Sequence, residues 1–167
     1  MPSKTVDGLR DLYSDELKDV YDAEKQVIEA LPKMAQAATS DQLRQGFEMH
    51  LEQTQGHLER LQQILGRHGI NPGNKKCVAM QGIIKEGDHA IKLKGDNAVR
   101  DAALIAAAQR VEHYEIAAYG TLRAFAKDLN HGDDMALLDQ TLQEEGDTDK
   151  KLTKLAQKIN QIALTTP

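Results

Sequence analysis

The spacing of apolar residues is the feature that most limits the folds open to this chain. In four long segments, at about 5–37, 39–67, 96–129 and 131–162, apolar residues recur every three or four positions, which is the pattern of amphipathic helices. Counted with the expected capping residues, which are Thr39 for the second segment and those of "NHGDD" for the fourth, only two or three residues join the segments of each pair. The first two segments, and likewise the last two, are therefore expected to form antiparallel hairpins. The middle connection has about 27 residues, and within it "KKCVAMQGIIKEGDHAIKL" is predicted to form one short helix.

These connections predict an all-α fold, in which two antiparallel hairpins form a four-helix bundle and a long crossover carries a short extra helix. A crossover that can run the length of the bundle is typical of ferritin-like bundles, whereas an up-down-up-down bundle would not need one. Aromatic residues are only 4% of the chain and Trp is absent, so the core must be mainly aliphatic, which favours helices packed on helices. We expect a single domain over residues 1–167, with its core at about 5–162.

Charge and cysteine content limit the partners and the location that the chain can have. The formal net charge is −5, which argues against nucleic acid as the main partner. No uninterrupted apolar run approaches the roughly 20 residues that span a bilayer, so no membrane insertion is expected. The N-terminal segment lacks the apolar stretch of a signal peptide, and Cys77 is the single cysteine. Both features predict a cytoplasmic location.

Several carboxylates fall where an amphipathic helix should be apolar. In the first helix Glu24 lies in the middle of the apolar stripe, and in the third helix Glu115 does the same, with Glu112 one turn earlier at the edge. In the fourth helix Glu145 is centred in the stripe and Asp149 follows one turn later. Counted from the two short loops, all of these positions fall near the middle of the bundle. Three helices are therefore expected to aim carboxylates at the bundle axis.

Anions that are gathered in a low-dielectric core repel one another and raise each other's pKa. Two divalent cations would neutralise four carboxylates, which is the arrangement of dinuclear carboxylate sites in helical bundles. The alternative is that the third-helix glutamates lie on a solvated rim or form a network with Arg110 and Arg123. Tyr21, Tyr114 and Tyr119 are candidate hydrogen-bond donors to the carboxylates, or else simply core residues.

Four segments, "YDAEKQ", "HLEQTQGHLERL", "VRDAALIAAAQRVEHYEIAAYGTL" and "TLQEEGDTDKKLTKLA", closely resemble the YciF-like bacterial stress-response family of the ferritin-like superfamily. The resemblance covers residues 5 to 160, and its third-helix segment is the most specific part. It implies a rubrerythrin-like bundle, a cytoplasmic protein that is associated with stress response, and usually a homodimer. It also implies a dinuclear metal site.

The family pattern assigns metal ligands by position, and the resemblance carries over carboxylates from three helices: Glu24, Glu112, Glu115 and Glu145. The pattern places a histidine three residues after the fourth-helix glutamate, but this chain has Thr148 there. Asp149 would then have to substitute.

The second helix departs further from the pattern, which places Glu-x-x-His there. The chain offers Glu52-x-x-Gln55, but Glu52 projects about 150° away from the leucine stripe. His50 and His57 are seven residues apart on one face and nearer the edge of the core, so we favour them as ligands over Glu52. Histidines beside an apolar stripe are also common as packing residues, which is the alternative.

Two functions follow from these observations. The first is a ferritin-like metalloprotein that holds iron or manganese in a dinuclear site and reacts with oxygen or peroxide. Because the sequence has no Cys-x-x-Cys module, electrons for such a cycle would come from an external donor. The second is a metal-free structural or interaction protein that acts through its dimer or partner surface.

Overall fold

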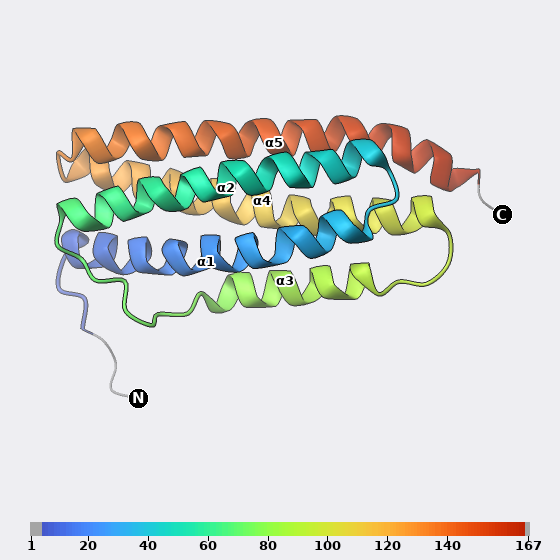
Figure 1. Ribbon diagram of the computed structural model, residues 1–167. Helices are drawn as coiled ribbons and strands as arrows, with labels where there is room; N and C mark the ends of the chain where they lie inside the picture. The colour runs from blue at the N-terminus through green and yellow to red at the C-terminus, as the bar shows by residue number, and fades with distance from the viewer. Residues whose placement is uncertain (1–4, 166–167) are drawn as a thin grey trace.

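The computed structural model describes residues 5–165, and all regular structure within this range is helical (Figure 1). The helices are α1 (Leu9–Ala37), α2 (Asp41–Arg67), α3 (Val78–Ile91), α4 (Asn97–Asp128) and α5 (Gly132–Leu164). The single domain that we expected over residues 1–167 includes residues outside the described range. None of the helices in that range has the combined length and apolar character needed to cross a bilayer.

The helices form a bundle with one long crossover, as the loop lengths predicted. α1 and α2 pack as one hairpin and α4 and α5 as the other, while α1 also packs on α4 and α2 on α5. The crossover runs back along the bundle, so that α4 starts at the same end as α2 (Figure 1). Within it, α3 lies against α1 and α4 and covers the seam between them. The all-α fold with ferritin-like connectivity is therefore confirmed.

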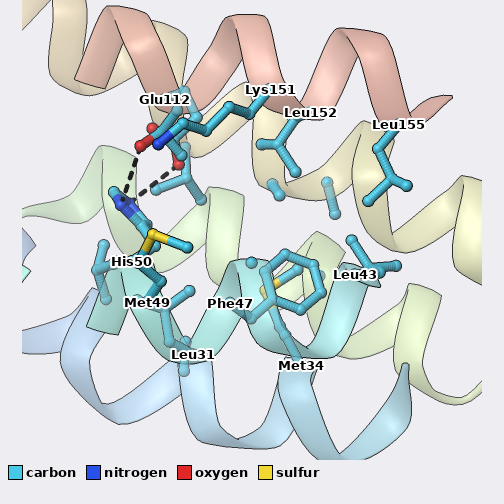
Figure 2. A pocket seen from close by; sticks show the side chains of 18 of the residues that line it. Leu31, Met34, Leu43, Phe47, Met49, His50, Glu112, Lys151, Leu152 and Leu155 are labelled. Carbon is cyan, nitrogen blue, oxygen red and sulfur yellow. Dashed lines mark hydrogen bonds and ion pairs between the residues drawn. The ribbon is translucent and has the colours of Figure 1, made fainter. Parts of the chain in front are cut away.

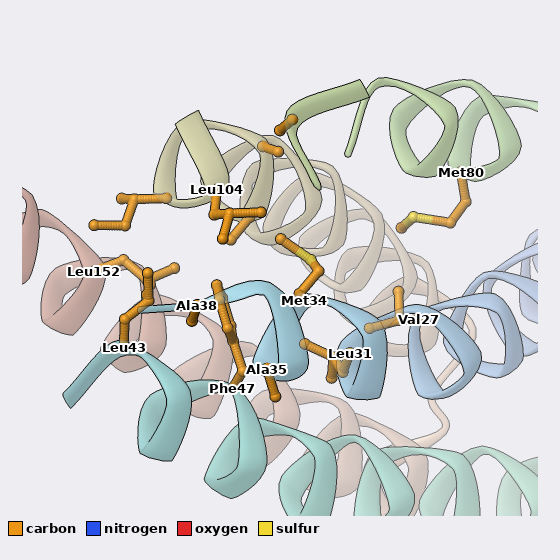
Figure 3. Packing of buried hydrophobic residues seen from close by; sticks show 14 of the residues in the cluster. Val27, Leu31, Met34, Ala35, Ala38, Leu43, Phe47, Met80, Leu104 and Leu152 are labelled. Atoms are coloured by element: carbon orange, nitrogen blue, oxygen red, sulfur yellow. The ribbon is translucent and has the colours of Figure 1, made fainter. Parts of the chain in front are cut away.

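The core consists of two apolar clusters, one toward each end of the bundle. One cluster packs aliphatic and sulfur-containing side chains around Phe47, including Leu31, Leu104 and Leu152 (Figure 3). The other contains Tyr13 and residues such as Leu17, Leu61, Leu122 and Leu138. On each of the four bundle helices, the positions between the two clusters are buried but polar. The apolar ends therefore fix the helix register, and the register sets the geometry of the polar layer between them.

Helix starts are fixed by side chains that accept backbone N–H groups. Ser40 caps α2 by accepting from the backbone N–H of Leu43, and Asp96 caps α4 by accepting from those of Ala98 and Val99. The spacing of Thr39 and Gln42 predicts Thr39 as the α2 cap, but its backbone N–H is instead bound by Asp101 of α4. This cross-helix contact ties the two hairpins together at one end.

Candidate metal centre

The polar layer holds a cluster of acidic and histidine side chains from all four bundle helices. Each has at most 3% of its surface exposed. Its six members, called the central cluster below, are Glu24, His50, His57, Glu112, Glu115 and Glu145. They are the predicted ligands apart from Asp149.

The central cluster divides into two sets of ligand atoms that share one residue. Glu24, His57 and Glu145 form one set, and within it every pair of ligand atoms lies within 4.8 Å. The other set satisfies the same limit and consists of His50, Glu112, Glu115 and Glu145. Nitrogen and carboxylate donors at this spacing suit first-row transition metals. Glu145 is the residue that belongs to both sets.

Hydrogen bonding within the central cluster is incomplete, although its atoms lie close together. His57 Nδ1 is 2.9 Å from Glu145 Oε1 and 3.5 Å from Glu24 Oε1, yet Nδ1 is in neither case in hydrogen-bond geometry. In the described part of the chain, eight buried side-chain nitrogen and oxygen atoms lack a hydrogen-bond partner, and all eight belong to the central cluster. Leaving buried polar atoms unpaired costs about 1–3 kcal/mol each. The eight atoms are therefore ones that a bound cation could satisfy.

His57 is held by a carboxylate that the sequence analysis missed. His57 Nε2 lies 2.9 Å from Glu144 Oε2 and is hydrogen-bonded to it. Arg60 binds both oxygens of Glu144, at 3.0 and 2.9 Å. A histidine that ligates a metal generally donates its other ring N–H to such a carboxylate. The Arg60–Glu144 pair therefore orients His57 so that Nδ1 faces the cluster.

His50 occupies the part of the layer where the family pattern has a fourth-helix histidine. Its Nε2 lies 3.1 Å from Glu112 Oε1 (Figure 2) and 3.6 Å from Glu145 Oε2. Its Nδ1 lies 3.5 Å from the hydroxyl of Thr148, the residue that replaces that histidine. Burial lowers the pKa of His50, which favours the neutral imidazole that a metal requires.

Without a bound cation, the negative charge of the central cluster is suppressed by protonation. Burial raises the pKa of Glu112 to about 8. Burial also raises the pKa of Glu145 to about 7, although His57 opposes the shift. For Glu115, burial and then the nearby Glu145 and Glu24 place the pKa well above its usual value. Burial lowers the pKa of His57, but the adjacent Glu145 and Glu24 carboxylates outweigh it and raise that pKa to about 10.

One predicted ligand, Asp149, lies outside the central cluster, and so does Glu52, which the sequence had argued against. Asp149 is not part of the central cluster, because its position on α5 faces the edge of the bundle. There Asp149 accepts a hydrogen bond from Gln109 at 3.1 Å and lies 3.3 Å from His113 Nε2. The expectation that Asp149 substitutes for the missing histidine therefore finds no support in the geometry. Glu52 is exposed, as its projection predicted.

Of the three tyrosines considered, only Tyr119 touches the central cluster. Its hydroxyl donates a hydrogen bond to Glu24. The Tyr114 hydroxyl instead lies 3.0 Å from Cys77 Sγ and donates to Asp19, and that of Tyr21 accepts from Gln62 at the surface. Burial raises the pKa of Cys77, so its thiol is protonated and poorly nucleophilic.

A second group of possible ligands, His68, His131 and Asp134, lies at the end of the bundle near the α4–α5 loop. Asp134 is buried and accepts a hydrogen bond from the Tyr13 hydroxyl at 3.0 Å, while His68 and Arg67 contact its two oxygens. Protein side chains already bind both oxygens of this carboxylate by hydrogen bonds and ion pairs. The group therefore stabilises the end of the bundle, and its carboxylate does not need a metal as a partner.

Comparison with known proteins agrees with this architecture. Protein YciF of Escherichia coli (strain K12) is 47% identical over 157 residues, which cover 93% of each chain. The crystal structure of the E. coli stress protein YciF superposes with a TM-score of 0.90 at 45% identity, covering 93% of this chain and 99% of that one. YcfI from Rhodopseudomonas palustris gives a TM-score of 0.86 at 44% identity, covering 92% and 98%.

A protein from Xanthomonas campestris pv. campestris, at 20% identity and a TM-score of 0.75 over 93% of this chain and 95% of that one, shares the fold. A family described as a domain of unknown function, DUF892, matches residues 8–165. With the identity to YciF, this match confirms the relationship that the sequence segments predicted. The chain belongs to the DUF892 family, of which it is a YciF-like member.

Proposed function

We propose that the protein is a stress-response metalloprotein whose central cluster binds two divalent ions, iron or manganese, and reacts with oxygen or peroxide. The observation that carries the proposal is the set of eight unpaired buried atoms, all of them on the central cluster. An unpaired buried carboxylate is costly, and a cation is the ligand that satisfies several at once. The stress role is inferred from the relationship to the E. coli stress protein YciF.

The two sets of ligand atoms define how the residues would share the ions. Glu24 and His57 would hold one ion and His50, Glu112 and Glu115 the other, with Glu145 between them. Such a pair of ions supplies redox chemistry toward oxygen or peroxide. The protein's own part is to hold the donors in place through the Arg60–Glu144 pair and to exclude bulk water by burial.

Electron supply and assembly are parts of the same proposal. Because the sequence contains one cysteine and no Cys-x-x-Cys module, we propose that an external donor supplies the electrons. The family relationship leads us to propose a cytoplasmic homodimer. Sedimentation equilibrium of the purified protein would measure its oligomeric state, and a monomer at micromolar concentration would refute the dimer.

A metal-free structural or interaction protein is the second candidate, and one observation favours it. The histidines and carboxylates already contact one another, with His50 Nε2 at 3.1 Å from Glu112 Oε1 and His57 Nδ1 at 2.9 Å from Glu145 Oε1. A protonated cluster of this kind could hold the layer together without an ion. The raised pKa of Glu112 is consistent with that state.

Metal analysis separates the two candidates. The protein is purified without a histidine tag or chelator, analysed for metals, titrated anaerobically with ferrous iron and then exposed to air. We expect two ions per chain, oxygen consumption and a new near-ultraviolet absorption band. Glu115→Ala should abolish tight binding without loss of helix content in circular dichroism, while the exposed Glu52→Ala serves as the matched control. Failure of the wild-type protein to bind metal, or loss of metal in the Glu52 variant, would refute the assignment.

A further inference from the structure

A cavity of about 390 Å³ lies beside the central cluster and is lined mainly by apolar side chains (Figure 2). Its walls include Leu31, Phe47 and Leu152, and it reaches the cluster at His50 and Glu112. The volume is within the roughly 300–1,000 Å³ range of small-molecule sites, which combine apolar walls with a few polar groups. The cavity therefore brings an apolar ligand next to the candidate metal centre.

The cavity opens along the seam between α2 and α5. Every exposed residue in its wall comes from one of these two helices, and Met49, which is 50% exposed, lies at this opening. Among the described helices, α3 packs on α1 and α4, so it covers the opposite seam and leaves this one free. A ligand can therefore reach the cavity without the bundle opening.

The opening carries positive charge although the chain as a whole is acidic. Lys151, Lys154 and Lys158 line the cavity on the α5 side, and glutamines line the facing α2 side. None of the three lysines forms an ion pair with residues in the described range. The acidic residues in the wall are Glu112, which belongs to the central cluster, and Asp88, which lies on α3 away from the seam. The lysine edge is thus available to an anionic group.

We propose that this cavity binds an unbranched aliphatic carboxylate, that is, a fatty acid. The hydrocarbon chain lies in the apolar interior with its far end toward His50 and Glu112, and the carboxylate lies at the lysine edge. Binding itself requires no metal. Only the position of the ligand next to a metal centre rests on the proposed function.

The test is calorimetric titration of the full-length protein, with and without manganese, using hexanoate, octanoate, decanoate and dodecanoate. Affinity should rise about three- to fourfold for each buried methylene until the cavity is full. Replacement of Lys151, Lys154 and Lys158 together by Gln should weaken dodecanoate binding about tenfold and leave dodecanol binding unchanged. The matched control replaces three exposed lysines outside the cavity by Gln: Lys33, Lys127 and Lys150.

A cavity-filling change tests the location. Ala108 is buried in the wall, so Ala108→Phe should reduce dodecanoate affinity more than about tenfold. The lysine variants remain informative even if this variant fails to fold. The proposal would be overturned by equal affinity for hexanoate and dodecanoate, or by no binding at all. It would also be overturned if sedimentation and crosslinking showed that a second copy of the chain covers the seam.

The two proposals can fail separately. Glu115 belongs to the central cluster but does not line the cavity. Dodecanoate binding by a metal-free Glu115→Ala variant would therefore support the cavity on its own. If the wild-type protein binds metal but none of the fatty acids, the cavity proposal is refuted and the proposed metal centre is not affected.

Discussion

Loading the central cluster with a divalent metal at pH 7 should release about three protons, because metal ligands must be deprotonated. At that pH Glu112, with a pKa of about 8, and His57, with a pKa of about 10, are mostly protonated. Glu115 is also protonated because its pKa is raised well above the usual value, and Glu145, with a pKa of about 7, is partly protonated. The apparent affinity should therefore rise about a thousandfold per pH unit near pH 7.

Manganese is the suitable ion for this measurement because it is stable in air as the divalent ion. Calorimetric titration at one pH in two buffers of different ionisation enthalpy gives the number of protons released, and titrations at pH 6.5 and 7.5 give the slope of the affinity. Glu115→Gln removes one ligand, so it should abolish tight binding together with the proton release that accompanies it. Glu52→Gln, at an exposed position, should leave both the binding and the proton count unchanged. Release of fewer than about one proton, or an affinity that does not depend on pH, would refute the reasoning.

Three further predictions concern the groups around the cluster. Because the pKa of Glu112 is raised from 4.5 to about 8 on folding, and that of His57 from 6.5 to about 10, folding takes up protons. The metal-free protein should thus become less stable as the pH rises from about 7 to 9. For each proton that folding takes up, the loss should be up to about 1.4 kcal/mol per pH unit. A free energy of urea unfolding that does not change over this pH range would contradict this. Tyr119→Phe removes the hydroxyl that binds Glu24 and should weaken manganese binding about tenfold without unfolding the bundle; unchanged affinity in titration would show that the hydroxyl does not position Glu24. Asp134→Asn should lower the free energy of unfolding by about 2–3 kcal/mol, since it weakens buried charge-assisted contacts at the bundle end; a change below about 0.5 kcal/mol in urea unfolding would contradict this.

The bundle was predictable because its helices and loops are encoded locally. Apolar spacing identified the four long helices, and loop length fixed which of them form hairpins. The helix ends were less predictable because they depend on the tertiary structure. At the start of α2, where Ser40 is the cap, Asp101 of a different helix binds the backbone N–H groups of both Thr39 and Ser40. At the start of α5, the predicted capping by the loop residues fails, since His131 makes no side-chain cap bond.

The carboxylates of the cluster could be predicted because they are charged residues within apolar stripes. The sequence pattern put the two histidines near the edge of the core, whereas the structure buries them. The prediction drew the α2 stripe through its leucines, including Leu51 and Leu58, which are only half-buried. The buried face of α2 instead keeps a three-and-four spacing through His50, Thr54 and His57. Continuing the spacing through polar residues, instead of following the leucines, would have placed both histidines in the core.

The same three-and-four spacing explains which residues of the fourth helix, α5, face the core. The buried positions of α5 run through Thr141, Glu145, Thr148 and Leu152, so Thr148 faces the core and Asp149 its edge. The contribution of Glu144 could not be predicted from α5 alone, because Glu144 is only partly buried and acts by binding His57 and Arg60 of another helix. Contacts that join neighbouring helices carry no local signature in the sequence.

The missing fourth-helix histidine does not by itself argue against a metal site. Dinuclear sites in ferritin-like bundles use four carboxylates and two histidines, with the histidines on two different helices. The central cluster has the same numbers of each, but both of its histidines come from α2 and two of its carboxylates from α4. His50 reaches across the α2–α5 seam to contact Thr148, at the position where the pattern has the histidine. Because the ligand positions of all four helices lie in one layer of the bundle, one helix can supply a ligand that its neighbour lacks. Four carboxylates can then still balance two divalent ions, although their positions in the sequence differ from the family pattern.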